Sequence, residues 1–241
     1  MIDPRSKTMK QIAVDWPAAI PVFERHHLDF CWTGDKPLEV VAAEGGVLLE
    51  IVLSDLRLAV AEHETEQPDW TASGLDALMR HIVVQHHEYL RHELPLMEQL
   101  IARLRAARSR TDTATVVPLE KVFRFFKREL ENHLRKEEEV LFPMIAQLEA
   151  ASVAGVRLPR YPFGPIANPI GIMEEEHDAE RRELAKMLGL TGNYSASAEA
   201  SAIYRTLFER LTTLDADMRR HVHLENHILF PRVEVLENAS C

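Results

Sequence analysis

Residues 133–143 read HLRKEEEVLFP, and residues 221–231 read HVHLENHILFP. In both stretches a histidine is followed four residues later by a glutamate and then, at identical offsets, by Leu-Phe-Pro. A His and a Glu four residues apart on a helix lie on one face, one turn apart. The repeat therefore predicts two helices that each present an imidazole and a carboxylate, a combination that could bind metal.

Apolar residues recur at three- and four-residue steps through the rest of the chain, a spacing typical of amphipathic helices. The predicted helices span residues 79–104, 123–148, 170–188 and 207–229. Stretches rich in helix-breaking residues separate them, at 111–115, 155–169 and 191–193. Four such helices joined by short connections predict an all-α fold, an antiparallel four-helix bundle.

A separate small module is expected before the bundle. Pro17, Pro21 and Pro37 divide the N-terminal part of the chain into short helices. The stretch that follows is rich in Glu, Thr, Ser and Pro and is typical of a linker. We therefore expect a small helical, cysteine-containing N-terminal domain at 1–62, a linker at 63–74 and the bundle at 75–241.

The repeated His and Glu lie on the apolar faces of their helices. His133 and Glu137 fall between Leu130 and Val140, and His221 and Glu225 continue the series of apolar residues that ends at Met218. An ionised carboxylate on a core face costs several kcal/mol unless it is paired or bound to metal. The register therefore predicts that both pairs lie inside the bundle.

A second repeat supplies two more histidines. The segments at 87–94 and 177–184 share the pattern His-acid-x-x-Arg-x-Glu-Leu, and their histidines are 90 residues apart. The chain is thus two half-bundles, each with one His on its first helix and His-x-x-x-Glu on its second. The candidate metal ligands are His87, His133, Glu137, His177, His221 and Glu225.

The ligand types discriminate between metals. A tetrahedral structural zinc would use four ligands, usually including Cys, and calcium or magnesium would prefer oxygen. Two metal ions fit better, each bound by two His and both bridged by the two Glu and by an oxo or hydroxo group. Mixed imidazole and carboxylate ligands with open positions favour iron, although manganese and zinc are not excluded. A bundle that binds no metal is the structural alternative.

Other polar residues are expected on different faces. The acidic residues at 138–139 and 174–176 are interpreted as solvated. Another group of histidines is interpreted as surface residues or as neighbours of the ligands: His81, His86, His92, His223 and His227. Pro95, Pro143 and Pro231 are expected to kink their helices.

Composition excludes several classes of protein. A net charge of −10 argues against nucleic-acid binding, which needs a basic surface. Apolar runs fall short of the ~20 residues of a membrane span, and the N-terminus lacks the apolar segment of a signal peptide. Two cysteines, Cys31 and Cys241, do not make a disulfide framework. A cytoplasmic protein is therefore expected.

The repeated His-x-x-x-Glu-x-x-x-Leu-Phe-Pro text and the Glu-Glu-His-Asp segment at 175–178 resemble the hemerythrin-like family. Oxygen-carrying hemerythrins have a second His four residues after the one on the third helix, where this chain has Arg181. They also end with a His and an Asp five residues apart, where this chain has His221 and Glu225 four apart. These departures direct the interpretation away from oxygen carriage.

The chain is more similar to the iron–sulfur cluster repair subfamily, also called regulators of cell morphogenesis and nitric oxide signalling. The resemblance covers nearly the whole chain, and the metal ligands of that subfamily match the six candidates above. The text from Leu28 to Gly34, with Cys31, resembles the cysteine-bearing module of these proteins. Many members carry two adjacent cysteines, whereas Trp32 follows Cys31 here. Cys31 is therefore either a single thiolate ligand or iron relay, or a buried structural residue.

The resemblance implies a protein with two iron ions per chain that repairs or protects iron–sulfur clusters under nitrosative or oxidative stress. The alternative is a nitric oxide-binding scavenger or sensor associated with denitrification, and reduction of nitric oxide to nitrous oxide is a third reading. Whether the protein is an enzyme stays open, and no catalytic residue is assigned. Expected partners are nitric oxide or another diatomic ligand and iron–sulfur proteins, and a homodimer is left open.

Overall fold

The computed structural model describes residues 4–62, 68–107, 110–157, 159, 161–162, 164–197 and 200–238. Within these residues the chain is helical and forms no strand, only two isolated β-bridges, Thr8–Pro37 and Tyr161–Gly164. The all-α prediction is therefore confirmed. Cys241 and residues 63–67 of the predicted linker lie outside the described residues.

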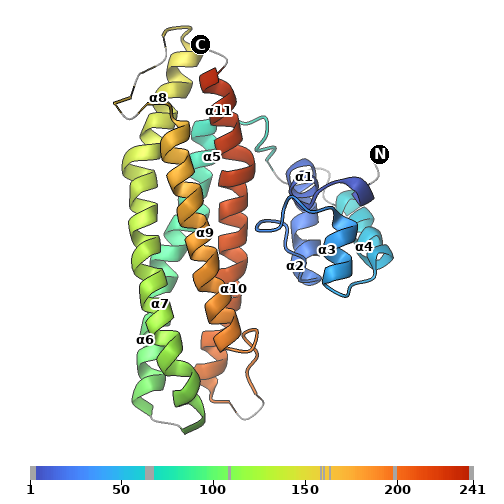
Figure 1. Ribbon diagram of the computed structural model, residues 1–241, viewed down its shortest axis with the longest axis vertical. Helices are drawn as coiled ribbons and strands as arrows, with labels where there is room; N and C mark the ends of the chain where they lie inside the picture. Colours follow the sequence, from blue (N-terminus) through green and yellow to red (C-terminus); the bar gives the residue numbers. More distant parts are fainter. Residues whose placement is uncertain are drawn as a thin grey trace. The chain divides into compact units, whose positions relative to one another are not determined.

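Long helical rods make up the bundle and run in alternating directions, as Figure 1 shows. The first rod consists of α5 (Leu75–Ile82), η3 (Val83–His87) and α6 (Glu88–Ala107). The second rod consists of α7 (Arg110–Lys136), η4 (Glu137–Leu141) and α8 (Phe142–Val153). The third rod is α9 alone (Ala167–Leu190). The fourth rod consists of α10 (Ala202–Leu224), η5 (Glu225–Leu229) and α11 (Phe230–Asn238). The stretch 111–115, predicted as a break, instead lies in the first turns of α7.

The chain divides into two compact units by its internal contacts. One comprises Met1–Gly74 with Arg219–Pro231, and the other Leu75–Met218 with Arg232–Cys241. Because this division assigns part of the last rod to the first unit, the domain limits 1–62, 63–74 and 75–241 stay a prediction.

The N-terminal helices are short: η1 (Pro4–Ser6), α1 (Met9–Asp15), η2 (Pro17–Ala19), α2 (Ile20–Arg25), α3 (Leu38–Glu44) and α4 (Leu49–Glu62). Thr8 and Gln11 form a capping box that begins α1, in which each side chain accepts a hydrogen bond from the other residue's backbone N–H. The apolar side chains of these helices are packed inward, and Met9, Ile12, Phe23 and Leu38 are fully buried.

Three rods are interrupted by a π-helical turn, in which the backbone N–H bonds the carbonyl five residues earlier. These turns are η3, η4 and η5. Pro143 and Pro231 lie just beyond η4 and η5; having no N–H, they cannot form the α-helical bond to the carbonyl four residues earlier. The wider turn also changes the register of the helix. Val140, which the α-helical spacing places on the apolar face, is therefore 50% exposed, while Leu141 is buried.

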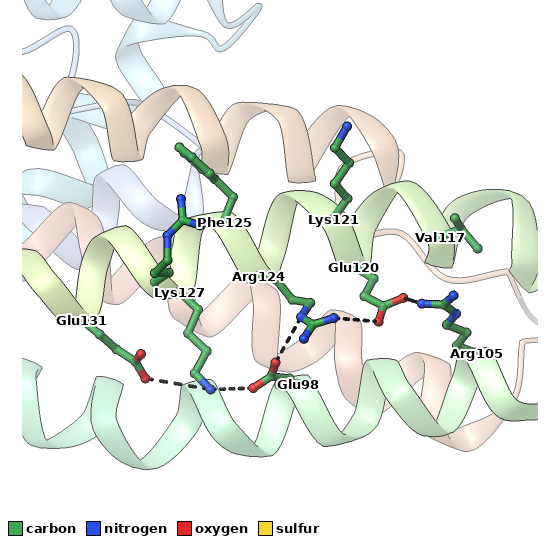
Figure 2. A pocket seen from close by; sticks show the side chains of 10 residues that line it. Glu98, Arg105, Val117, Glu120, Lys121, Arg124, Phe125, Lys127 and Glu131 are labelled. Carbon is green, nitrogen blue, oxygen red and sulfur yellow. Dashed lines mark hydrogen bonds and ion pairs between the residues drawn. The ribbon is translucent and has the colours of Figure 1, made fainter.

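The outer faces of α6 and α7 form a groove bridged by ion pairs (Figure 2). Glu120 of α7 pairs with Arg105 of α6, and Glu98 of α6 pairs with Arg124 and Lys127 of α7. Exposed pairs of this kind contribute little stability individually, but they place opposite charges of α6 and α7 next to each other. Several of the charged side chains that line the groove are thus paired across the two helices.

No helix among the described residues combines the length and the apolar character that crossing a bilayer requires.

Substitution of two nearby phenylalanines on α7 tests which face of this helix packs into the core of the bundle. Phe123 is fully buried, whereas Phe125 is 44% exposed. Phe123→Ala is expected to lower the free energy of unfolding by about 3–5 kcal/mol, because it leaves a cavity in the bundle. Phe125→Ala should cost less than about 1 kcal/mol, since that ring contacts mainly solvent and the Arg128 guanidinium. Urea unfolding of both variants measures the difference, and equal losses would contradict this packing.

Candidate metal centre

All six candidate ligands point into the bundle. Each has at most 1% of its surface exposed, although His and Glu are usually solvated. They come from every rod: His87 ends η3, His133 lies on α7, Glu137 begins η4, His177 lies on α9, His221 lies on α10 and Glu225 begins η5. The structure therefore brings together the residues that the two sequence repeats single out.

The six side chains form two overlapping groups of four. One contains His87, Glu137, His221 and Glu225, and the other contains His133, Glu137, His177 and Glu225. Within each group, one nitrogen or oxygen atom from every residue lies within 4.8 Å of the others. Glu137 and Glu225 belong to both groups, as is expected of carboxylates that bridge two ions.

The carboxylate of Glu137 faces a different histidine with each oxygen. Its Oε2 lies 3.4 Å from Nε2 of His87, and its Oε1 lies 3.3 Å from Nε2 of His133. This places one carboxylate between the two groups of imidazoles. On the opposite rod, Oε1 of Glu225 lies 3.1 Å from Nε2 of His221.

Two imidazole nitrogens also face each other. Nε2 of His133 and Nε2 of His177 are 3.1 Å apart in the buried interior. A neutral imidazole has one donor and one acceptor nitrogen, so two acceptor nitrogens at this distance would repel unless a cation or a proton lay at them. A shared metal ion satisfies both nitrogens, and the imidazole and carboxylate donors fit iron.

The π-helical turns coincide with the candidate ligands. Glu137 and Glu225 are the first residues of η4 and η5, and His87 is the last residue of η3. Such turns occur mostly at functional sites, where the extra residue redirects a side chain. The same Glu residues thus begin the irregular backbone and supply the carboxylates common to both groups.

Two further glutamates orient the imidazoles. Oε1 of Glu138 lies 2.6 Å from Nδ1 of His87, and Oε2 of Glu176 lies 3.0 Å from Nδ1 of His133. An acceptor at Nδ1 holds the proton there, which leaves Nε2 to bind metal. Both glutamates are predicted from the sequence to lie on solvated faces rather than among the ligands. Both are partly exposed and lie outside the two groups, but their contacts with the histidines were not predicted. Their positions in the sequence could have indicated these contacts, because Glu138 directly follows the candidate ligand Glu137 and Glu176 directly precedes the candidate ligand His177.

The charges of the centre perturb the pKa values of its residues. Hydrogen bonds from His133 and from Lys136 together lower the pKa of the Glu176 carboxyl to about 2. Burial disfavours the charged form of His133, but the carboxylates of Glu137 and Glu180 outweigh that effect and raise its pKa well above the ordinary value. The interior is therefore rich in negative charge and favours a cation.

The remaining histidines stay outside both groups. His86 pairs with Asp217 at 2.9 Å, and His92 is exposed. His223 and His227 contact each other through Nδ1 at 2.9 Å. Burial lowers the pKa of His223 to about 3 and of His227 to about 4, so both are neutral at pH 7.

Cys31 also lies outside both groups. It is buried, with 6% of its surface exposed. Its backbone N–H donates to Oδ1 of Asp29, which also accepts from the N–H of Trp32. The same side chain accepts from Thr33 through its other oxygen, Oδ2. Asp29 therefore fixes the loop that carries the cysteine, and a role for the thiol in iron chemistry stays a proposal.

Comparisons with known proteins agree with this geometry. Residues 78–233 match the family model described as "Hemerythrin HHE cation binding domain", and residues 5–60 match one described as "Domain of Unknown function (DUF542)". The "Iron-sulfur cluster repair protein YtfE" of Cronobacter sakazakii is 32% identical over 229 residues, which cover 95% of this chain and 96% of that protein. The "Probable iron-sulfur cluster repair protein" of Haemophilus influenzae is 31% identical over 231 residues, covering 93% and 95%.

The orienting role of Glu138 and Glu176 can be tested by removing their charge. Glu138→Gln and Glu176→Gln are each expected to weaken metal binding by about 10- to 100-fold, because the imidazole loses the carboxylate that fixes its tautomer. Competition titration with a coloured chelator measures the affinity. The exposed neighbours Glu139→Gln and Glu175→Gln are matched controls. Equal affinity in all four variants would contradict the role.

Proposed function

Because this chain belongs to the hemerythrin-like family of iron–sulfur cluster repair proteins, we propose that it repairs or protects iron–sulfur clusters under nitrosative or oxidative stress. The observation that carries the proposal is the fully buried cluster of four imidazoles and two carboxylates. The relatives named as repair proteins match both the bundle and the N-terminal module, so the proposal concerns the whole chain.

The cofactor in this proposal is a pair of iron ions. His87 and His221 would hold one ion, His133 and His177 the other, and Glu137 and Glu225 would bridge them. The membership of both glutamates in both groups supports this assignment. Iron bound there would supply redox chemistry and an exchangeable cation. Glu138 and Glu176 hold the imidazoles of His87 and His133 in the metal-binding tautomer, and the bundle encloses the six side chains.

The number of protein ligands supports iron donation. Each group offers four ligand residues, two of them shared, whereas iron with imidazole and carboxylate ligands commonly takes five or six. An ion with so few ligands of its own can be transferred to an acceptor. The partners would be iron–sulfur proteins that have lost iron, encountered in the cytoplasm, and Cys31 would offer a thiolate during transfer.

The same ligand count favours nitric oxide binding as a second candidate function. An ion with an open position can accept a diatomic molecule, and two adjacent ions could hold two such molecules side by side. Scavenging, sensing or reduction of nitric oxide would then use the iron without releasing it. Loss of iron to an acceptor therefore indicates repair, whereas retention of iron indicates nitric oxide binding.

Metal content tests the assignment of the bridging residues. The protein purified after expression with added iron is expected to contain about two irons per chain by elemental analysis, since two groups of ligands are present. The double variant Glu137→Ala, Glu225→Ala should lose both, because each removed carboxylate serves both ions. Glu139→Ala, on an exposed side chain of the same turn, is the matched control. Unchanged iron content in the double variant would show the assignment to be wrong.

Iron transfer tests the repair function. The iron-loaded protein, incubated anaerobically with an iron–sulfur enzyme that has lost iron, is expected to restore that enzyme's cluster and activity while its own iron content falls. Cys31→Ser should slow the transfer without changing iron content at the start, if the thiolate receives iron. Formation of a stable nitrosyl adduct on addition of nitric oxide, with full retention of iron and no restored activity, would favour the second candidate.

A further inference from the structure

Glu180 is a buried carboxylate that the six-residue centre does not use. Only 3% of its surface is exposed, and neither of its oxygens has a hydrogen-bond partner among the described residues. Burying an ionised carboxylate without a partner costs several kcal/mol in general. A side chain retained under that cost requires a compensating positive charge.

The helix places Glu180 beside the centre. It follows His177 by three residues on α9, and residues three apart are neighbours on one face of a helix. Glu180 therefore lies on the face of α9 that carries His177, one of the two histidines of the group formed with His133.

The internal repeat shows that this carboxylate is not required for packing. In the matching segment, His87-Glu-Tyr-Leu90 stands where His177-Asp-Ala-Glu180 stands here. Leu90 is fully buried, so the equivalent position of the other half holds an apolar side chain. Glu93, one turn further on, is also largely buried but pairs with Arg210.

We propose that Glu180 is a seventh ligand of the metal centre, a carboxylate that binds the ion held by His133 and His177. This inference rests on the metal centre of the proposed function and extends it. The bound ion would place a positive charge beside the buried carboxylate, whose two oxygens accept no hydrogen bond among the described residues.

The seventh ligand makes the two ions unequal. The ion at His133 and His177 gains an anionic ligand of its own. The ion at His87 and His221 gains none, because the equivalent position of that half is the buried Leu90. The ion at His87 and His221 is therefore the one held more weakly, and the first to leave for an acceptor or a chelator. The centre would release one iron and keep the other.

Stepwise release of ferrous iron to a chelator tests the inference. The wild-type protein should lose its two ions in two phases, and Glu180→Gln should speed the slower phase by about tenfold or more while leaving the faster one unchanged. Glu183→Gln, the same change on the same helix at a partly exposed residue paired with Lys186, is the matched control. Identical release from wild type and Glu180→Gln would overturn the inference.

Stability of the metal-free protein gives an independent readout. A buried carboxylate without a partner destabilises the protein when no metal is present, so Glu180→Gln and Glu180→Leu are each expected to raise the melting temperature of the metal-free protein by about 5 °C. The Leu variant copies the residue of the other half and is expected to fold. An unchanged or lower melting temperature in both variants would contradict a carboxylate kept for metal binding.

The two proposals can fail separately. If Glu180→Gln speeds the slower phase but the loaded wild-type protein does not restore an iron–sulfur enzyme, the ligand assignment stands and the repair function falls. If the enzyme is restored equally well and the release phases are identical in both proteins, the repair function stands and Glu180 is not a ligand.

Discussion

The cost of burying Glu137 and Glu225 is the constraint on which the rest of the structure depends. Both carboxylates are fully enclosed by the bundle, where an uncompensated charge is expensive. Four imidazoles converge on them, and the pKa shift of His133 shows that the interior favours positive charge. The proposed pair of cations would offset this cost, and it would account for the contribution of a His or a Glu from every rod of the bundle.

The backbone is adapted to the same requirement. The π-helical turns η4 and η5 begin at the two glutamates, and η3 ends at His87. Each turn changes the direction of the side chains that follow, which is why Leu141 rather than Val140 returns to the core. The rod α9 has no such turn, and it is the one that carries Glu180 next to its histidine. The two halves of the bundle are therefore alike in ligands but unequal in their surroundings.

Much of this site could be predicted from the sequence because helical periodicity converts spacing into position. The six candidate ligands follow from two repeats and from the apolar residues around them. The π-helical turns could not be predicted, since they depend on the packing of the rods as well as on Pro143 and Pro231. Glu138 and Glu176 were missed because runs of acidic residues are usually solvated. Glu180 is not among the six candidates because the repeat pattern leaves this position unspecified, with Glu180 in one half and Leu90 in the other.

The central claim is that Glu137 and Glu225 bridge two ions inside the bundle. Anomalous X-ray diffraction at the iron edge, from crystals of the iron-loaded protein, tests it directly. The account predicts two anomalous peaks separated by about 3.5 Å, each next to two histidines and both next to the two glutamates. One peak, or peaks that lie away from either glutamate, would contradict it.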